Sequence, residues 1–395
     1  MKKISMAHCE VMPVDYDRVD QVLSSAQLSP GPFCREFETR FARLYQAKHA
    51  LFLNSGTDAL RLSLIAMKEK FKWPDGSKVA VPALTFVASV NVILQANLEP
   101  YFVDVGMHDY NMNPDNLSRR LEDGTQNVVA VMPVHLFGQQ ADMPAIARIA
   151  EKHKLRILED SCETVGAGPL WGDISCFSTY QAHIVATGIG GLAVTSDDEL
   201  NEILRSLANH GRDPSYLPGY RTPEISGDLL KRRFRFLRNG YSCRASEFEA
   251  AIGLGQLERL EQNLVQRRDV AAQLFKRLDQ YAGLKLPTPV YPRLHSYMMF
   301  PILLKQTSRA VKEDLLLDLE NAGIETRDMM PVTNQPVFEK YFKDASFSVA
   351  DEINRSGFYV PCHPGMTQAD IDYIACVFDE YLWGRLDKKL IAQHT

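Results

Sequence analysis

In the N-terminal half of the chain, short apolar runs alternate with segments whose apolar residues recur at helical spacing. The apolar runs lie at residues 49–54, 78–84, 99–105, 127–137 and 155–162, with a further one at 190–196. Helical spacing is clearest over residues 55–71, 85–97 and 143–154. Short strands separated by helices are typical of a mostly parallel sheet covered on both faces. We therefore predict an α/β fold for this half.

The C-terminal half predicts a smaller α+β domain. A long helical pattern at 245–283 is expected to lead into it, followed by a strand within 296–304 and a helix over 309–323. A closing helix is expected from Gln368. A chain of 395 residues is too long to form one simple hydrophobic core. We therefore place a large domain, including the N-terminal segment, at 1–260 and a small domain at 261–395. Residues 213–240, broken by Pro and Gly, predict a loop or flap that is either functional or a solvated connection.

Composition and charge narrow the class of protein. The formal net charge of −5 supplies no basic surface for nucleic acid. No apolar run is long enough to span a bilayer, and MKKISMAHCEVMPVDYD lacks the apolar run of a signal peptide. The 7 cysteines are scattered without a CxxC pair, which argues against a metal site or a disulfide framework. We expect a soluble, cytoplasmic protein with reduced thiols.

Polar residues that could carry chemistry follow the predicted strands. Ser55, Gly56 and Thr57 lie between a strand and a helix, where N–H groups and hydroxyls can hold a phosphate. The alternative is an ordinary helix cap. Asp160 ends an apolar strand, and parallel sheets bind ligands at that edge. It could bind a protonated heterocycle nitrogen or cap the next helix. Glu163 is expected near the same edge.

A histidine and an aromatic residue add to this set. His183 follows the strand-like CFSTY and precedes the flexible TGIGG. Histidine is suited to proton transfer near neutral pH, although an isolated histidine is more often structural. It cannot form a Schiff base, because that bond requires an amine. Phe86 falls just past a strand end, where it could stack on a planar ligand or belong to the core.

The order of these motifs resembles the DegT/DnrJ/EryC1/StrS family, the sugar aminotransferases and dehydratases among the fold-type I pyridoxal-phosphate (PLP) enzymes. The resemblance covers nearly the whole chain. Its main stretches are NSGTDAL, VPALTFVASVNVILQANLEPYFVDV, VVAVMPVHLFGQQADMPAIARIAEKHKLRILEDSCETVGA, CRASEFEAAIGLGQLERLE, AGIETR and YVPCHPGMT. The resemblance implies an aspartate-aminotransferase-like fold, with a mostly parallel central sheet and a smaller α+β C-terminal domain.

The resemblance also implies how the cofactor phosphate is held. Gly56 and Thr57, beside Ser55, match the backbone cradle of the family. Ser178 matches a hydroxyl that contacts the phosphate. Ser242 stands where the family has an asparagine that reaches the phosphate in the neighbouring subunit. This set implies a PLP site built at the subunit boundary.

Phe86 matches the residue that stacks on the cofactor ring, and Asp160 matches the partner of the pyridinium nitrogen. That contact keeps the ring an electron sink. His183 occupies the position of the family's Schiff-base lysine, as in the nucleotide-sugar 3-dehydratases. In those enzymes the cofactor binds noncovalently as its amine form (PMP), and the histidine moves a proton from the cofactor methylene while the C3 hydroxyl of a 4-keto sugar leaves. Glu163 agrees with this interpretation, because the aminotransferases usually carry glutamine at the matching position.

The chain departs from those dehydratases at Ile184 and Ile189, where they carry a second histidine and an acid. Two alternatives therefore stay open. One is another PLP-dependent reaction, such as an unconventional aminotransferase acting on a sugar or an amino-acid-like substrate. The other is a non-catalytic homologue that binds a cofactor or ligand. An iron–sulfur cluster of the family type needs four late cysteines, and only Cys243, Cys362 and Cys376 follow His183.

The partners implied by the resemblance are a nucleotide-sugar substrate, glutamate as a possible amino donor, and a second copy of the chain. In a homodimer with shared sites, residues 213–244 would reach the partner's site. Nucleic acid and membrane are not expected as partners. Candidate substrate-side residues are His210, Arg212, Arg238, Arg244, His295 and Arg327. For Arg238, a solvated surface arginine is the equal alternative.

Overall fold

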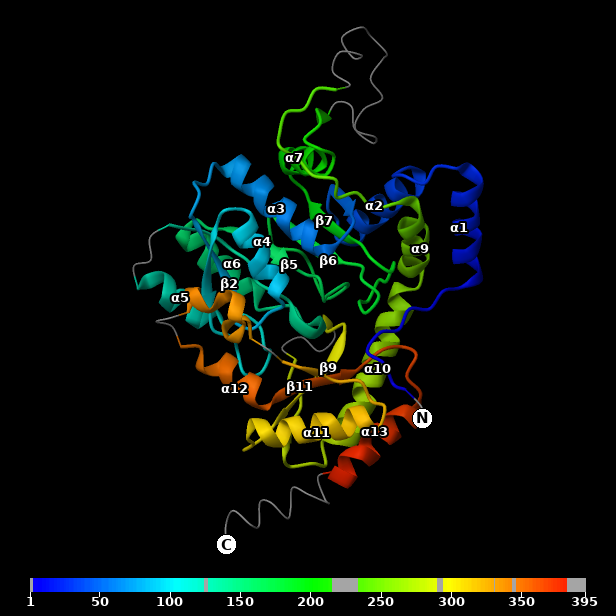
Figure 1. Cartoon of the computed structure of the whole chain (residues 1–395), viewed down its shortest axis with the longest axis vertical. Helices are drawn as coiled ribbons and strands as arrows, with labels where there is room; N and C mark the ends of the chain where they lie inside the picture. Colours follow the sequence, from blue (N-terminus) through cyan, green and yellow to red (C-terminus); the bar gives the residue numbers. More distant parts are fainter. Residues whose placement is uncertain are drawn as a thin grey trace.

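The computed structural model describes residues 3–123, 127–214, 234–289, 294–329, 331–342 and 346–381. Its centre is a 7-stranded sheet in the order β1-β7-β6-β5-β4-β2-β3 (Figure 1). The strands are β1 (His49–Leu53), β2 (Lys78–Pro82), β3 (Glu99–Val103), β4 (Val128–Val131), β5 (Arg156–Asp160), β6 (Ile174–Ser178) and β7 (Gly191–Thr195). Only β7 runs antiparallel to its neighbours in this sheet. The predicted α/β fold with a mostly parallel sheet is confirmed.

Helices alternate with these strands as the apolar pattern predicts. They are α1 (Pro13–Ser25), α2 (Pro32–Leu44), α3 (Gly56–Phe71), α4 (Val87–Gln95), α5 (Pro114–Glu122), α6 (Met143–His153), α7 (Asp198–Ala208), α9 (Glu247–Glu258), α10 (Leu260–Leu278), α11 (Arg309–Asn321), α12 (Ser348–Ser356) and α13 (Gln368–Tyr381). Short 3-10 turns lie at Leu136–Gly138, Val332–Asn334 and Pro336–Tyr341. Several helices begin at side-chain caps, such as Asp142 before α6 and Ser308 before α11.

Successive side chains on a strand point to opposite faces of the sheet, and each face packs against its own layer of helices. On β2, Val79 and Val81 belong to the core shared with α3 and α4. Ala80 between them belongs to a separate cluster with α5 and α6. All three side chains are fully buried, as expected for a parallel sheet with both faces covered.

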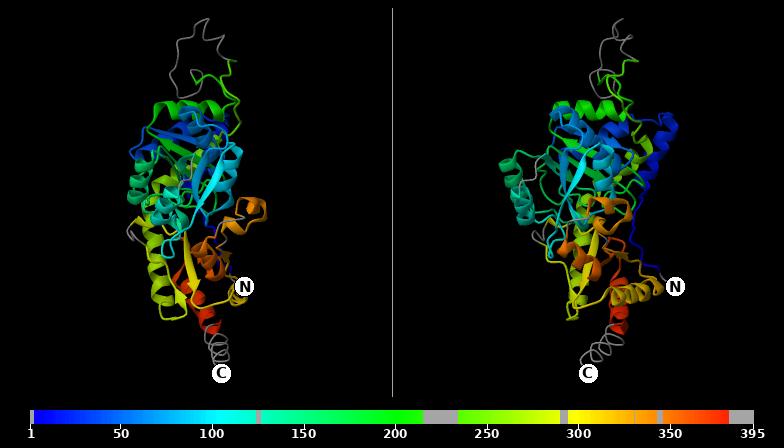
Figure 2. Two further views of the ribbon diagram at one scale, coloured as in Figure 1. Left: turned by 90° about the vertical axis from the view of Figure 1, so that its left-hand side faces the viewer. Right: turned by 60° about the vertical axis from the view of Figure 1, so that its left-hand side comes forward.

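A second sheet, in the order β10-β11-β9-β8, lies beyond the first one. Its strands are β8 (Leu284–Lys285), β9 (Met299–Leu304), β10 (Arg327–Asp328) and β11 (Gly357–Pro361), all antiparallel. It shares a core with α11, α13 and the second half of α10. The N-terminal segment joins this unit, since Ile4 pairs with Ile324 and the Met6 N–H donates to Glu325 at 2.8 Å. Figure 2 shows the N-terminus at this end of the molecule.

The predicted continuous helix over 245–283 is wrong. It breaks at Arg259, whose backbone leaves the helical region at φ −100° and ψ 2°. The Arg259 guanidinium there pairs with the buried Asp15 of α1 at 2.7 Å. Beyond the break, α10 carries Leu264 of the first core and Val270 of the second. The domain boundary at residue 260 stays a prediction.

The apolar run at 127–137 forms a strand only over β4, because Pro133 lacks the N–H that would continue the ladder. Most of the predicted loop at 213–240 lies outside the described residues, which omit 215–233. Across the described ranges, no helix is long and apolar enough to cross a membrane.

Candidate active site

The first turn of α3 packs tightly against the ends of two strands. A Cβ atom on Gly56 would lie 2.8 Å from the Ser178 Cβ and 2.9 Å from the Cys162 Sγ. A Cβ atom on Gly191, at the start of β7, would lie 2.3 Å from the Gly56 nitrogen. Both positions therefore require glycine, and this close packing places Ser178 beside the start of the helix.

The same turn offers hydrogen-bond donors. Ser55 caps α3, because its Oγ accepts the Asp58 N–H at 3.0 Å. The N–H groups of Gly56 and Thr57 belong to the first helical turn, which lacks acceptors within the helix and attracts an anion. The Ser178 Oγ accepts the Tyr180 N–H at 3.2 Å and keeps its own proton to donate. The helix cap and the anion cradle can therefore exist together, because the cap uses the Ser55 side chain and the Asp58 N–H, whereas the cradle uses the N–H groups of Gly56 and Thr57.

Asp160 ends β5 next to this cradle and is almost fully buried. One carboxylate oxygen accepts the Ser89 hydroxyl at 2.8 Å, and the other accepts the Cys162 N–H at 3.2 Å. Ser89 comes from the first turn of α4 and also contacts Thr85 at 2.9 Å. These bonds fix a carboxylate at the sheet edge, where it can accept a proton-bearing ring nitrogen.

Glu163 lies three residues on, half-buried, and its Oε2 accepts the Phe137 N–H at 2.7 Å. Burial, with a smaller contribution from the charge of Asp160, raises the pKa of Glu163 to about 7, although the hydrogen bond from the Phe137 N–H acts in the opposite direction. The Glu163 carboxyl can therefore hold a proton near neutral pH. Phe137 has a left-handed backbone conformation, with φ 58°. In this conformation its N–H points toward the Glu163 carboxylate.

His183 lies in the loop between β6 and β7, and this loop is closed by its own backbone. The Thr179 N–H donates to the Gly190 carbonyl at 3.0 Å, and the Thr187 N–H donates to the Thr179 carbonyl at 2.8 Å. The His183 N–H donates to the Tyr180 carbonyl at 2.8 Å. The loop therefore has a defined shape.

The imidazole of His183 is partly buried, with the Tyr180 ring edge-on to it at 6.0 Å between centroids. Its Nδ1 atom is buried and finds no hydrogen-bond partner among the described residues. Burial lowers the pKa of His183 to about 4, and the buried Arg267 acts in the same direction. The ring is therefore neutral at physiological pH, the form that accepts a proton.

A pocket of about 540 Å³ opens next to Glu163 and Phe86. The Phe86 side chain is 69% exposed, so it is available to stack on a ligand and is not a core residue. The opposite wall comes from β10, β11 and α11. The lining residues are Leu84, Thr85, Phe86, Val87, Leu136, Phe137, Glu163, Leu316, Thr326, Arg327, Asp328, Met329, Gln335 and Tyr359.

Of the candidate substrate residues, Arg327 lines this pocket and His295 does not. The Arg327 guanidinium bonds to the Glu325 carboxylate and to the Thr326 carbonyl. His295 is buried and stacked on Tyr297, and its Nδ1 accepts the Tyr297 N–H at 2.9 Å. Burial lowers the pKa of His295 to about 3, which fits a structural histidine.

Other predicted residues gather in the segment 234–244, away from the pocket. Arg244 pairs with Leu53 at the end of β1, and its Nη2 donates to the exposed Ser242 Oγ at 3.1 Å. Arg238 Nε donates to the Glu69 carboxylate at 2.8 Å. In this chain Arg238 thus forms a surface ion pair.

His210 and Arg212 follow the end of α7 in the sequence. Figure 1 shows α7 in the upper part of the molecule. His210 is exposed in a left-handed turn, with φ 62°. The Arg212 guanidinium lies 5.6 Å from the ring centroids of Phe234 and Phe236. The structure does not bring these two residues to the described pocket.

The sequence places His135 just past a strand end, but sequence reasoning missed its buried partner, Glu159, behind Asp160. The His135 Nδ1 accepts the Ala141 N–H at 3.2 Å, so its Nε2 donates to Glu159 at 3.1 Å. Glu159 also accepts the Ser175 hydroxyl at 2.6 Å. The His135 N–H donates to the Asp160 carbonyl at 3.0 Å, so the pair holds the strand end in place. The sequence did contain a signal for this pair, since Glu159 is a second carboxylate next to Asp160 in an apolar strand.

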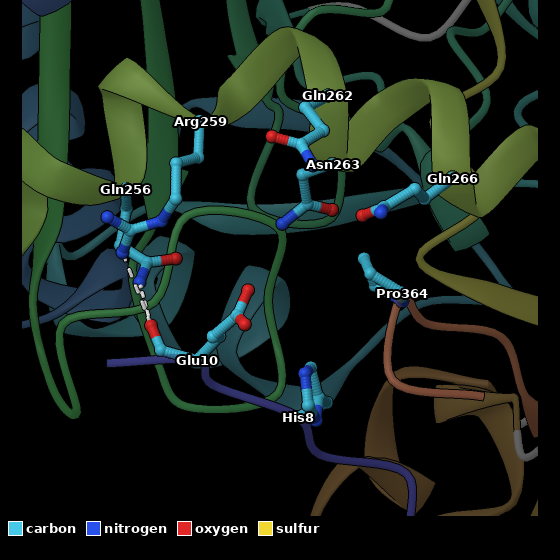
Figure 3. Close-up of a pocket in the computed structure, with 8 residues that line it drawn as sticks. All are labelled: His8, Glu10, Gln256, Arg259, Gln262, Asn263, Gln266 and Pro364. Carbon is cyan, nitrogen blue, oxygen red and sulfur yellow. Dashed lines mark hydrogen bonds between the residues drawn. The ribbon is translucent and has the colours of Figure 1, made fainter. Parts of the chain in front are cut away.

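A smaller polar cavity of about 30 Å³ lies between the N-terminal segment and the α9–α10 junction (Figure 3). Gln256 and Arg259 donate to the Glu10 carbonyl at 2.8 and 3.3 Å. Asn263, which also lines it, donates to the Ile184 carbonyl at 3.4 Å. These contacts tie α10 to the N-terminal segment and to the loop of the histidine.

Comparison with known proteins agrees with this arrangement. The chain is 31% identical over 392 residues to GDP-perosamine synthase from Caulobacter vibrioides, covering 97% of this chain and 99% of that protein. It is 30% identical over 395 residues to dTDP-4-dehydro-2,6-dideoxy-D-glucose 3-dehydratase from Saccharopolyspora spinosa, covering 93% and 84%.

Solved structures match over a similar share of the chain, at lower sequence identity. The E. coli GDP-4-keto-6-deoxy-D-mannose-3-dehydratase with bound hydrated PLP superposes with a TM-score of 0.85 at 26% identity, covering 94% of this chain and 98% of that one. A structure of this type of dehydratase with a trapped PLP-glutamate geminal diamine gives 0.86 at 26% identity, covering 94% and 99%. The model of the DegT/DnrJ/EryC1/StrS aminotransferase family matches residues 13–378. The chain is a member of the DegT/DnrJ/EryC1/StrS aminotransferase family.

Proposed function

We propose that this protein binds PLP or PMP without a covalent bond and removes the C3 hydroxyl from a 4-keto-6-deoxy nucleotide sugar. The observation that carries the proposal is His183. It stands where the family resemblance expects a lysine, and its environment favours a neutral, proton-accepting imidazole. Relatives named as 3-dehydratases support the reaction class.

The residues at the sheet edge fit the cofactor. The donors of Gly56, Thr57 and Ser178, with Ser55 as the cap, suit its phosphate. The tight packing at Gly56 leaves the backbone, and no side chain, facing the anion.

The ring of the cofactor is served by two other residues. The buried Asp160 carboxylate suits a protonated ring nitrogen, and the exposed Phe86 suits the ring face. When bound, the cofactor supplies an amine for the sugar ketone and an electron sink for the electron pair.

Two titratable groups would divide the proton transfers: Glu163, which lines the pocket, and His183 in the loop between β6 and β7, which does not. His183 accepts a proton at a ring nitrogen, since its lowered pKa keeps it neutral. Glu163 holds a proton on its carboxyl up to a pKa of about 7 and can donate it toward a departing hydroxyl. Because the two environments shift these groups in opposite directions, one is a base and the other an acid at the same pH.

The proposal includes the partners. The substrate is a nucleotide sugar, glutamate regenerates the amine form, and the working unit is a cytoplasmic homodimer with shared sites. In that assembly Ser242 and Arg244 would serve the partner's cofactor phosphate. His210, Arg212 and Arg238 would lie on the same side, toward the nucleotide.

An aminotransferase is the second candidate, because the relative at 31% identity is a GDP-perosamine synthase. An aminotransferase transfers an amino group to the sugar, and it ordinarily uses a lysine to carry the cofactor. The chain has His183 at that place, which favours the dehydratase.

The test begins with PLP and PMP titrated into the purified protein and followed by near-ultraviolet and visible absorption. Binding without a borohydride-fixed protein adduct is expected for the native chain, and an adduct is expected for His183→Lys. Glutamate and GDP-4-keto-6-deoxymannose are then added, and the nucleotide sugar is identified by mass spectrometry. A dehydrated product supports the proposal. A protein that binds neither cofactor form would be a silent homologue, and both enzyme proposals would fall.

A further inference from the structure

One wall of the large pocket is rich in hydrogen-bonding side chains. This wall is formed by the residue before β10, by β10 and β11, and by the segment between them, which contribute Thr326, Asp328, Tyr359 and Gln335. Carboxylates, amides and hydroxyls of this kind bind sugar hydroxyls, while an aromatic face such as that of Phe86 covers apolar parts of a ligand. This wall faces the cofactor side, because Glu163 and Phe86 line the same pocket.

Lys312 of α11 lies behind this wall. Its side chain is 0% exposed, and its Nζ donates to the Asp328 Oδ1 at 2.5 Å. The same ammonium donates to the carbonyls of Asn354 and Gly357 at the end of α12. A buried ammonium is tolerated only with such compensation, so Asp328 is held as a carboxylate in a fixed position.

Asp328 is the exposed half of this pair. Its side chain is 22% exposed and lines the pocket. Lys312 uses Oδ1, and no hydrogen bond between described residues uses Oδ2. The neighbouring Arg327 does not neutralise it, because that guanidinium bonds to Glu325 and to the Thr326 carbonyl. The pocket therefore contains a fixed hydrogen-bond acceptor with one available oxygen.

Given the proposed function, we propose that Asp328, fixed by the buried ammonium of Lys312, is a specificity-determining acceptor for a hydroxyl group of the substrate's hexose ring. A hydroxyl donates to a carboxylate, whereas an anionic diphosphate is repelled by it. The sugar therefore points toward β10, and the diphosphate lies away from this wall.

The test measures kcat and KM with PLP, glutamate and GDP-4-keto-6-deoxymannose. Asp328→Asn keeps an acceptor for Lys312 but removes the charge, and Asp328→Ala removes the acceptor. We expect kcat/KM to fall roughly tenfold to a hundredfold for Asp328→Ala, mainly through KM, and less for Asp328→Asn. Glu313→Gln is the matched control, because Glu313 is an exposed carboxylate on α11, the helix of Lys312, and pairs with Arg309. This variant should keep the native kcat and KM.

A paired variant separates binding from folding. Lys312→Met with Asp328→Leu replaces the ion pair with apolar side chains and should melt near the native temperature, while KM stays raised. If this variant melts normally and keeps the native KM, Asp328 is only the counterion of Lys312 and the inference is overturned. If the native protein itself neither binds nor converts the sugar nucleotide, the proposed function fails first, and the inference fails with it.

Discussion

His183 owes its neutral form to its surroundings. Its Nδ1 is buried and has no hydrogen-bond partner in the described part of the chain. The buried Arg267, whose charge lowers the pKa of His183, donates to the carbonyls of Tyr297, Met298 and Cys362 and to Asn263. No carboxylate is among these acceptors, so the Arg267 charge opposes protonation of the imidazole. The sequence placed the histidine, but only the packing explains why it is neutral.

This environment predicts a bell-shaped pH dependence of kcat/KM. As the pH falls through about 4, His183 becomes protonated and loses its capacity as a base. As the pH rises through about 7, Glu163 loses its proton and its capacity as an acid. Glu163→Gln should remove the alkaline limb while lowering the rate. An acidic limb at the ordinary histidine value of about 6.5 would contradict the assignment.

The glycine at the start of α3 predicts a second residue-level effect. In Gly56→Ala, the added Cβ meets the Ser178 Cβ at 2.8 Å and the Cys162 Sγ at 2.9 Å, so the cradle must shift. We expect a loss of about 1–3 kcal/mol of stability, and PLP affinity at least tenfold lower. Thermal melting and equilibrium dialysis measure these changes. Gly283→Ala, with no atom within 4 Å of its added Cβ, should change neither.

At the scale of elements, a buried carboxylate joins α9 to α2. Glu247, the first residue of α9, is 1% exposed and accepts the N–H groups of Gly31, Phe33 and Cys34 at 2.8, 2.9 and 2.8 Å. A carboxylate at a helix start satisfies free donors and the helix dipole together. This contact holds the N-terminal helices against the segment that follows residues 234–244.

Glu247→Ala should therefore cost about 2–4 kcal/mol in the free energy of unfolding, because three buried N–H groups lose their acceptor. Denaturant titration measures the loss. Glu36→Gln, an exposed carboxylate on α2, should change stability by less than about 0.5 kcal/mol. Equal effects from the two variants would show that the buried carboxylate does not hold the helices.

At the scale of the whole molecule, the strand and helix pattern was predictable because each element has its own apolar periodicity. The strands leading to Ser55, Asp160 and His183 were placed correctly within a few residues. Contacts between distant segments were not predictable from local pattern. The Lys312–Asp328 pair spans α11 and β10, and the Glu159–His135 pair joins two strand ends. The break at Arg259 depends likewise on Asp15, which lies far away in the sequence.

The proposed homodimer with shared sites predicts complementation between two inactive variants. His183→Ala removes the base from one protomer, and Ser242→Ala with Arg244→Ala removes the groups proposed to reach the partner's phosphate. Mixed after partial dissociation, the two proteins should form hybrids with one intact site, recovering roughly a quarter of the native activity if the protomers mix at random. Sedimentation confirms the assembly, and hybrids without activity would show that each site is built by one chain.

The most direct test of the central claim follows the nitrogen of labelled glutamate in the presence of PLP and GDP-4-keto-6-deoxymannose. The native protein should release the label as ammonia and form a sugar that has lost its C3 hydroxyl. His183→Lys should instead shift the label toward an amino sugar, since the lysine restores the covalent carrier. Label found chiefly in an aminated sugar with the native His183 protein would contradict C3 dehydration and indicate transamination.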